Sequence, residues 1–199
     1  MPRVPPVPVD QLTPRARTML QEGFDCGAYN DNSGQFPPAM RILAWSTQAL
    51  EVAHAGAMAR WRAGLLDARL QELVRIRSAQ VNGCANCAAA IKEDGVSGDD
   101  VACMIDTDYS KFTPREAAAL RYVTKFGTDH HAIDDDDVRA LLVEFSPAEM
   151  VELVHYAAQM LGSHRMFSVF KVISDCEPLL TFDPELVDAP MQAKDDLAA

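Results

Sequence analysis

The chain has no long hydrophobic run. Across its 199 residues, no segment approaches the roughly 18 consecutive apolar residues that a membrane-spanning helix needs. The N-terminus also lacks the apolar core of a signal peptide. These absences predict a soluble, cytoplasmic protein with no membrane partner.

Positive charge is scarce. The sequence has 18 lysines and arginines against 29 aspartates and glutamates, which gives a formal net charge of −11. Nucleic acids and anionic membranes are themselves negative, so a chain of this charge repels them. We therefore expect no nucleic-acid partner, and we attribute the charge to solubility.

Cysteine is also sparse and irregularly spaced. Five cysteines are an odd number without a repeating framework, which argues against a small secreted scaffold held by disulfides. Reduced thiols in a cytosol fit better. Two of the five, Cys84 and Cys87, stand out because they form a Cys-x-x-Cys pair.

Helical signals run along the chain, and its C-terminal half contains no segment with the pattern of a strand. Two capping boxes with proline at the first helical position, at Thr113 with Glu116 and at Ser146 with Glu149, mark helix starts clearly. The spacing of apolar residues predicts helices over about 10–22, 38–62, 66–80, 84–95, 97–103, 113–127, 134–145 and from 147 well past 161. The predicted fold class is therefore all-α.

The length and the 48% hydrophobic content suit one domain with a substantial core. We expect a single helical domain over residues 1–180, which begins with an extended, proline-rich arm. Residues 181–199 should form an acidic, partly disordered tail. The helix that begins at Pro147 is apolar on most of its surface, which predicts a homo-oligomer.

The Cys-x-x-Cys pair follows a helix break at Asn82-Gly83. Glycine accepts the left-handed backbone that ends many helices, so Cys84 should stand at the entrance of the next helix. The positive end of a helix favours thiolate over thiol. A thiolate with a second cysteine one turn away can attack an oxidant and then be resolved as a disulfide. Glu72, on the preceding helix, could face the pair and hold or relay a proton.

A glutamate twelve residues before Cys-x-x-Cys, in the run Leu-Val-Arg-Ile-Arg-Ser-Ala-Gln-Val-Asn-Gly-Cys, resembles the alkylhydroperoxidase D and carboxymuconolactone decarboxylase superfamily. The similarity covers most of the chain. It implies an alkylhydroperoxidase D-like helical bundle that assembles as a trimer or hexamer. It also implies that Cys87 attacks the peroxide, that Cys84 is its partner thiol, and that Glu72 takes part in proton handling.

The sequence departs from the peroxidase pattern at two positions. Members of the family that act as peroxidases carry a histidine four residues after the second cysteine, where this chain has Ile91, and some carry one between the cysteines, where it has Asn86. A base raises the thiolate fraction and protonates the leaving oxygen. Three histidines could enter the site through folding: His54, His155 and His164.

These side chains also have structural interpretations. His155 is more often a core histidine on an apolar helix, and we interpret the adjacent His164 and Arg165 as structural. Arg75 or Arg77 could pair with Glu72, which would make it a poorer base. A zinc site at the two cysteines would need two further ligands at suitable spacing, and none follows. We therefore expect no metal and no cofactor.

Our leading hypothesis is an antioxidant thiol peroxidase that reduces hydroperoxides through the dithiol. A lipoyl-type or thioredoxin-like protein would supply the reducing thiols. Two alternatives stay open: a lactone-acid decarboxylase, which would work without a redox dithiol, and a non-enzymatic redox-sensing module whose disulfide forms without turnover.

Overall fold

The computed structural model describes residues 2–29, 35–172 and 178–190, without the side chains of residues 61 and 86. Every regular element in these ranges is helical, so the all-α prediction is confirmed. None of the described helices combines the length and the apolar composition that crossing a membrane demands. The last nine residues of the predicted tail lie outside the described ranges.

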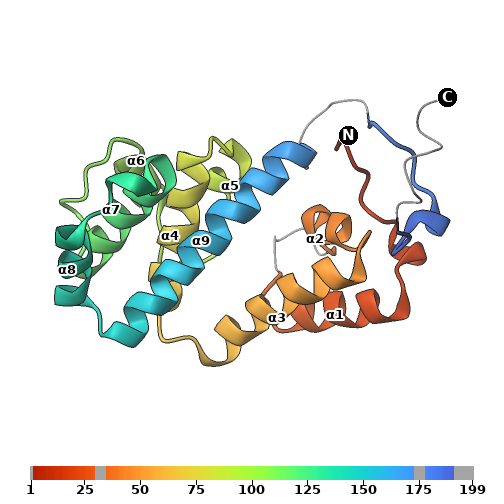
Figure 1. The fold of residues 1–199 in the computed structure, drawn as a ribbon, viewed down its shortest axis with the longest axis horizontal. Helices are drawn as coiled ribbons and strands as arrows, with labels where there is room; N and C mark the ends of the chain where they lie inside the picture. Colours follow the sequence, from red (N-terminus) through yellow and green to blue (C-terminus); the bar gives the residue numbers. More distant parts are fainter. Residues whose placement is uncertain (1, 30–34, 173–177, 191–199) are drawn as a thin grey trace. The chain divides into compact units, whose positions relative to one another are not determined.

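The chain divides into two compact units (Figure 1). Unit 1 comprises Met1–Arg62 and Phe170–Ala199, and unit 2 comprises Ala63–Val169. We describe each unit by itself. That residues 1–180 fold as one domain stays a prediction.

Unit 1 is built from short helices around one apolar cluster. Its elements are η1 (Val9–Gln11), α1 (Pro14–Asp25), α2 (Pro38–Leu43), α3 (Thr47–Ala63) and η3 (Pro184–Leu186). The proline-rich arm is extended but not loose, because Val7 is fully buried in this cluster together with Leu20 and Leu50. The arm is therefore part of the core of unit 1.

The long helix predicted from residue 38 to about 62 is interrupted between α2 and α3. The indole of Trp45 donates to the carbonyl of Pro5 at 2.7 Å. The carboxylate of Asp188 then accepts a hydrogen bond from the Thr47 N–H at 2.6 Å, which satisfies an orphan donor of the first turn of α3. Ser46 also caps α3 locally, because its hydroxyl accepts from the Ala49 N–H at 3.2 Å. The break therefore combines a local cap with contacts from both ends of the chain, and the sequence pattern does not show those distant contacts.

Unit 2 carries the Cys-x-x-Cys pair. Its elements are α4 (Ala68–Val81), α5 (Ala85–Ala89), α6 (Gly98–Ile105), α7 (Pro114–Thr128), η2 (His130–Ala132), α8 (Asp135–Glu144) and α9 (Pro147–Phe170). Helix α4 packs against α5, α6 and α7, and α7 packs against α8. Apolar residues of α4 and α7 contribute to two buried clusters, one shared with α8 and α9 and the other with α6. Helix α4 is therefore held on several sides.

The predicted helix starts in unit 2 are confirmed. Thr113 and Glu116 form a reciprocal capping box at α7. Ser146 and Glu149 exchange the same pair of bonds at α9, at 2.8 and 3.3 Å. These ends depend only on residues three positions apart, which is why the sequence shows them.

Candidate dithiol site

The turn between α4 and α5 delivers the two cysteines. Gly83 has φ +67°, and the N–H of Cys84 donates to the carbonyl of Ala79 at 2.9 Å. This 6→1 bond across a left-handed glycine closes α4 as predicted. Because the chain reverses here, Cys84 immediately precedes α5 and Cys87 lies within it.

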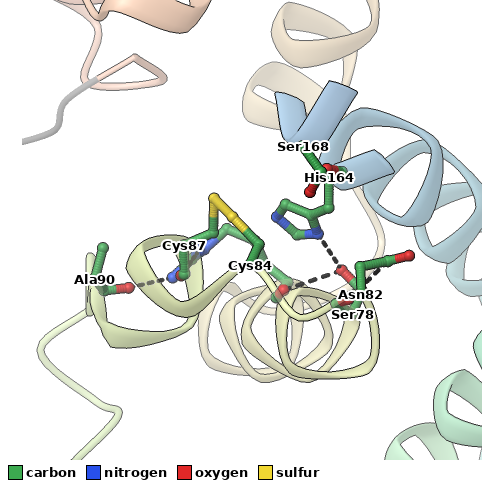
Figure 2. Close-up of a disulfide and its surroundings, with 8 residues drawn as sticks. Ser78, Asn82, Cys84, Cys87, Ala90, His164 and Ser168 are labelled. Atoms are coloured by element: carbon green, nitrogen blue, oxygen red, sulfur yellow. Dashed lines mark hydrogen bonds between the residues drawn. A yellow bond between two sulfur atoms is a disulfide. The ribbon is translucent and has the colours of Figure 1, made fainter. Parts of the chain in front are cut away.

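Cys84 and Cys87 are joined as a disulfide, with their Cα atoms 5.3 Å apart (Figure 2). That separation lies within the range of about 4.4–6.8 Å that disulfides need. Both side chains are half-buried, so they remain accessible. With this spacing, the two thiols can form the disulfide, and the disulfide can be reduced again, without a large change in the backbone.

Helix α5 is much shorter than expected. It ends at Ala89, whereas the sequence predicted a helix to about Gly95. The reason is a set of side-chain contacts from α4: Arg75 donates to the carbonyl of Cys87 at 2.7 Å and also to that of Ala90. These bonds satisfy the C-terminal carbonyls of α5 without further helix. A helix of five residues has a small dipole, so thiolate formation depends more on neighbouring side chains.

Glu72 is buried at 4% exposure and is paired with Arg75. The guanidinium donates to both carboxylate oxygens, at 2.7 and 2.8 Å. The N–H of Lys92 donates to Oε1 at 2.7 Å. The sequence left open whether Glu72 pairs with Arg75 or with Arg77, and the structure shows the pair with Arg75. Arg77 instead bonds to Thr124, Gln80 and the carbonyl of Met104.

His164 is one of the three histidines that the sequence offers for the site, although we interpret it there as structural. It projects from α9, is buried at 4% exposure, and points toward the disulfide (Figure 2). Its Nδ1 lies 2.9 Å from the hydroxyl of Ser78 on α4. Burial, together with the positive charges of Arg75 and Lys92, lowers its pKa from 6.5 to about 4. The ring is therefore neutral at pH 7.

Arg165, the neighbour of His164, turns elsewhere. Its guanidinium donates to the side-chain oxygen of Asn82 at 2.9 Å and to the carbonyl of Gly127 at 3.0 Å. It thus ties α9 to the turn before Cys84 and to the end of α7. These contacts suit the structural interpretation of Arg165, whereas the adjacent imidazole of His164 bonds to Ser78 and points toward the dithiol (Figure 2).

The other histidines that the sequence offered have different surroundings. His54 belongs to unit 1, where its two ring nitrogens contact the hydroxyl of Tyr29 at 2.9 Å and the carboxylate of Glu22 at 3.2 Å. Both nitrogens of that ring are thus occupied. His155 lies exposed on α9. Ile91, at the position of the missing histidine, packs against the buried cluster of α4, α6 and α7.

No group of three or more histidine, cysteine or acidic side chains gathers as a metal site within the described residues. Cys103 is buried and free, and Cys26 is half-buried and free.

Comparison with known proteins agrees with this arrangement. Residues 47–125 match the model of the carboxymuconolactone decarboxylase family. No curated protein matches the chain by sequence.

Three solved structures are similar in fold. A peroxidase-related protein from Silicibacter sp. TM1040 has a TM-score of 0.68 at 14% identity, covering 83% of this chain and 87% of its own. A protein of unknown function from Agrobacterium tumefaciens, named as a candidate antioxidant defence protein AhpD, has a TM-score of 0.56 at 26% identity, covering 65% and 92%. The apo debrominase Bmp8 has a TM-score of 0.69 at 17% identity, covering 93% and 96%.

The family match over residues 47–125 and the shared helical fold support a relationship between this chain and the alkylhydroperoxidase D and carboxymuconolactone decarboxylase superfamily.

Proposed function

We propose that the protein is a thiol peroxidase that reduces hydroperoxides at Cys84 and Cys87. The single observation that carries the proposal is the half-buried pair itself, which the turn after α4 holds with its Cα atoms 5.3 Å apart. A reactive dithiol must be accessible and must close into a disulfide without unfolding its surroundings. The likeness to a peroxidase-related protein and to a candidate antioxidant defence protein supports the same chemistry.

In the proposed reaction, the thiolate of Cys87 attacks the distal oxygen of the hydroperoxide. The O–O bond breaks, an alcohol leaves after it takes up a proton, and Cys87 becomes a sulfenic acid. The thiol of Cys84 then attacks that sulfur and releases water as the disulfide forms. One hydroperoxide and two thiols thus give one alcohol, one water and one disulfide. A lipoyl-type or thioredoxin-like dithiol restores the pair by exchange.

The contacts of Glu72 favour a positioning role. Its carboxylate holds Arg75, and Arg75 holds the carbonyl of Cys87. A direct part for Glu72 in proton handling stays a prediction. The same holds for a homo-oligomer of three or six copies and for a cytoplasmic location.

Peroxide consumption by cysteine variants tests the proposal. The reduced protein is mixed with one equivalent of cumene hydroperoxide, and free thiols are counted while mass spectrometry locates the new bond. We expect rapid loss of two thiols with a Cys84–Cys87 link. Cys87→Ser should abolish the reaction, whereas Cys26→Ser, which alters a free cysteine of unit 1, should leave it unchanged. If the thiols stayed reduced, the peroxidase assignment would be wrong.

The match to the decarboxylase family favours one alternative, a lactone-acid decarboxylase. That activity needs no redox dithiol, so Cys87→Ser would preserve it. A redox-sensing module is distinguished by turnover: its disulfide would form once and would not cycle when a dithiol reductant and excess hydroperoxide are both present.

A further inference from the structure

We propose that His164 is the base that serves the dithiol, and that Ser78 positions it by fixing which ring nitrogen carries the proton. The proposal deepens the function proposed above and rests on its thiol chemistry. It supplies the imidazole that the chain lacks at Ile91 from a different element, α9.

The first step of the argument is placement. The imidazole of His164 is buried and points from α9 toward the disulfide, with one nitrogen bonded to Ser78 and the other on the side of the sulfur atoms (Figure 2). By contrast, Ile91 packs into an apolar cluster. The family position is thus used for core packing, while a histidine from α9 points toward the dithiol.

The second step concerns the proton on the ring. The hydroxyl of Ser78 has one proton, and it donates to the carbonyl of Arg75 at 3.0 Å. The contact of 2.9 Å between Ser78 and His164 Nδ1 is then satisfied only if Nδ1–H donates to the hydroxyl oxygen. In a neutral ring this leaves Nε2 as the unprotonated nitrogen. Ser78 therefore directs the basic lone pair toward the dithiol.

The third step concerns the charges around the ring. Those that act on it are Arg75 of α4 and Lys92 after α5, and they favour the neutral ring. Arg75 is itself paired with Glu72, and Arg165 on α9 is bonded to Asn82 and Gly127. When the disulfide is reduced, a thiolate on the side of Nε2 adds a negative charge that favours the imidazolium. The thiol proton can therefore pass to Nε2 as the thiolate forms.

This assignment completes the proton balance of the proposed reaction. Nε2 takes the proton of the attacking thiol, and the imidazolium returns it to the alkoxide that leaves when the O–O bond breaks. The ring is neutral again when the disulfide has formed. No further reactant is required beyond the hydroperoxide and the reducing dithiol already named.

Alkylation of the reduced protein by iodoacetamide tests the base without peroxide. We expect His164→Gln to slow alkylation of the pair at pH 7 by about tenfold or more, in keeping with the usual contribution of a positioned base. The difference should vanish at high pH, where hydroxide ionises the thiols directly. Ser78→Ala should have a smaller effect of the same form.

Two controls separate this role from a structural one. His155→Gln changes an exposed histidine on the same helix, and Ser168→Ala removes a hydroxyl that bonds to the backbone carbonyl of His164 rather than to its ring. Neither should alter the pH profile of alkylation. A profile for His164→Gln that matches the wild-type profile would overturn the proposal, even if peroxide turnover is established.

Nuclear magnetic resonance of the imidazole nitrogens gives a second test that uses the unmodified protein. In the oxidised form at pH 7 we expect a neutral ring protonated on Nδ1, and its pKa should rise on reduction. A ring protonated on Nε2 would contradict the role of Ser78 and of the base. Failure of peroxide turnover with these signals intact would instead remove the peroxidase function and leave the base assigned.

Discussion

Glu72 and Arg75, three residues apart on α4, form a buried two-point ion pair. The side chains are 4% and 12% exposed, and the guanidinium donates to both carboxylate oxygens. Because Arg75 also donates to the carbonyl of Cys87, the pair joins the interior of α4 to the helix that carries the dithiol. The geometry of the cysteines therefore depends on a charge pair outside the Cys-x-x-Cys motif.

Arg75→Met should destabilise the protein strongly. It leaves the carboxylate of Glu72 buried without its partner, which typically costs about 3–5 kcal/mol. Arg139→Met is the matched control, because its pair with Asp136 has side chains that are 67% and 87% exposed and should contribute at most about 1 kcal/mol. Urea unfolding measures both. If the two variants lost similar amounts of unfolding free energy, the buried pair would contribute no more to stability than the exposed one.

Gly83→Ala should lower the free energy of unfolding through backbone strain alone. Its φ is +67°, and nothing lies within 4 Å of an added Cβ. A left-handed backbone costs an L-residue about 1–2 kcal/mol. Gly98→Ala also meets open space and should be neutral or stabilising by about 0.4–1 kcal/mol. Opposite signs in thermal unfolding would confirm that the turn before Cys84 requires glycine.

Gly127→Ala should disturb the packing of α7 against α4 and α9. An added Cβ would lie 2.7 Å from Val81 Cγ1 and 2.8 Å from Leu161 Cδ2. Overpacking of this kind typically costs about 1–3 kcal/mol. Gly162→Ala, on α9, meets nothing within 4 Å and should gain about 0.5–1 kcal/mol, the usual difference between glycine and alanine in a helix. If both variants were stabilised, the close approach would be absent in solution.

Stability of the oxidised protein should fall with acidification in a window set by His164. Its pKa is lowered from 6.5 to about 4 on folding. Between these values the unfolded chain binds a proton that the folded chain does not, so stability is lost as the pH falls through that window. The loss is on the order of 3 kcal/mol.

The variant His164→Gln isolates that contribution. Unfolding by urea from pH 7 to pH 4 should show a shallower decline for His164→Gln than for the wild type, while His155→Gln should follow the wild type. Parallel curves for the wild type and His164→Gln would contradict a neutral, buried ring.

Local interactions made part of this molecule predictable. The capping box at Thr113 depends on a residue three positions away, and the left-handed turn at Gly83 needs only a residue without Cβ. The dithiol was predictable for the same reason, since two cysteines one turn apart are neighbours on any helix. The all-α fold class followed from such local patterns, whereas the superfamily was suggested by the resemblance of the run from Glu72 to Cys87 to a known family.

Contacts between distant segments decided the rest. Asp188 caps a helix that begins at Thr47. Arg75, on α4, ends α5 by donating to the carbonyls of Cys87 and Ala90. The position of His164 depends on how α9 packs against α4, 86 residues away at Ser78. The spacing of apolar residues shows which face of a helix is buried. It does not show which residue of a neighbouring helix that face contacts. The sequence by itself therefore determined the capped helix starts and the spacing of the two cysteines, whereas only tertiary packing decided where helices end and that His164, rather than another histidine, bonds to Ser78 and points toward the dithiol (Figure 2).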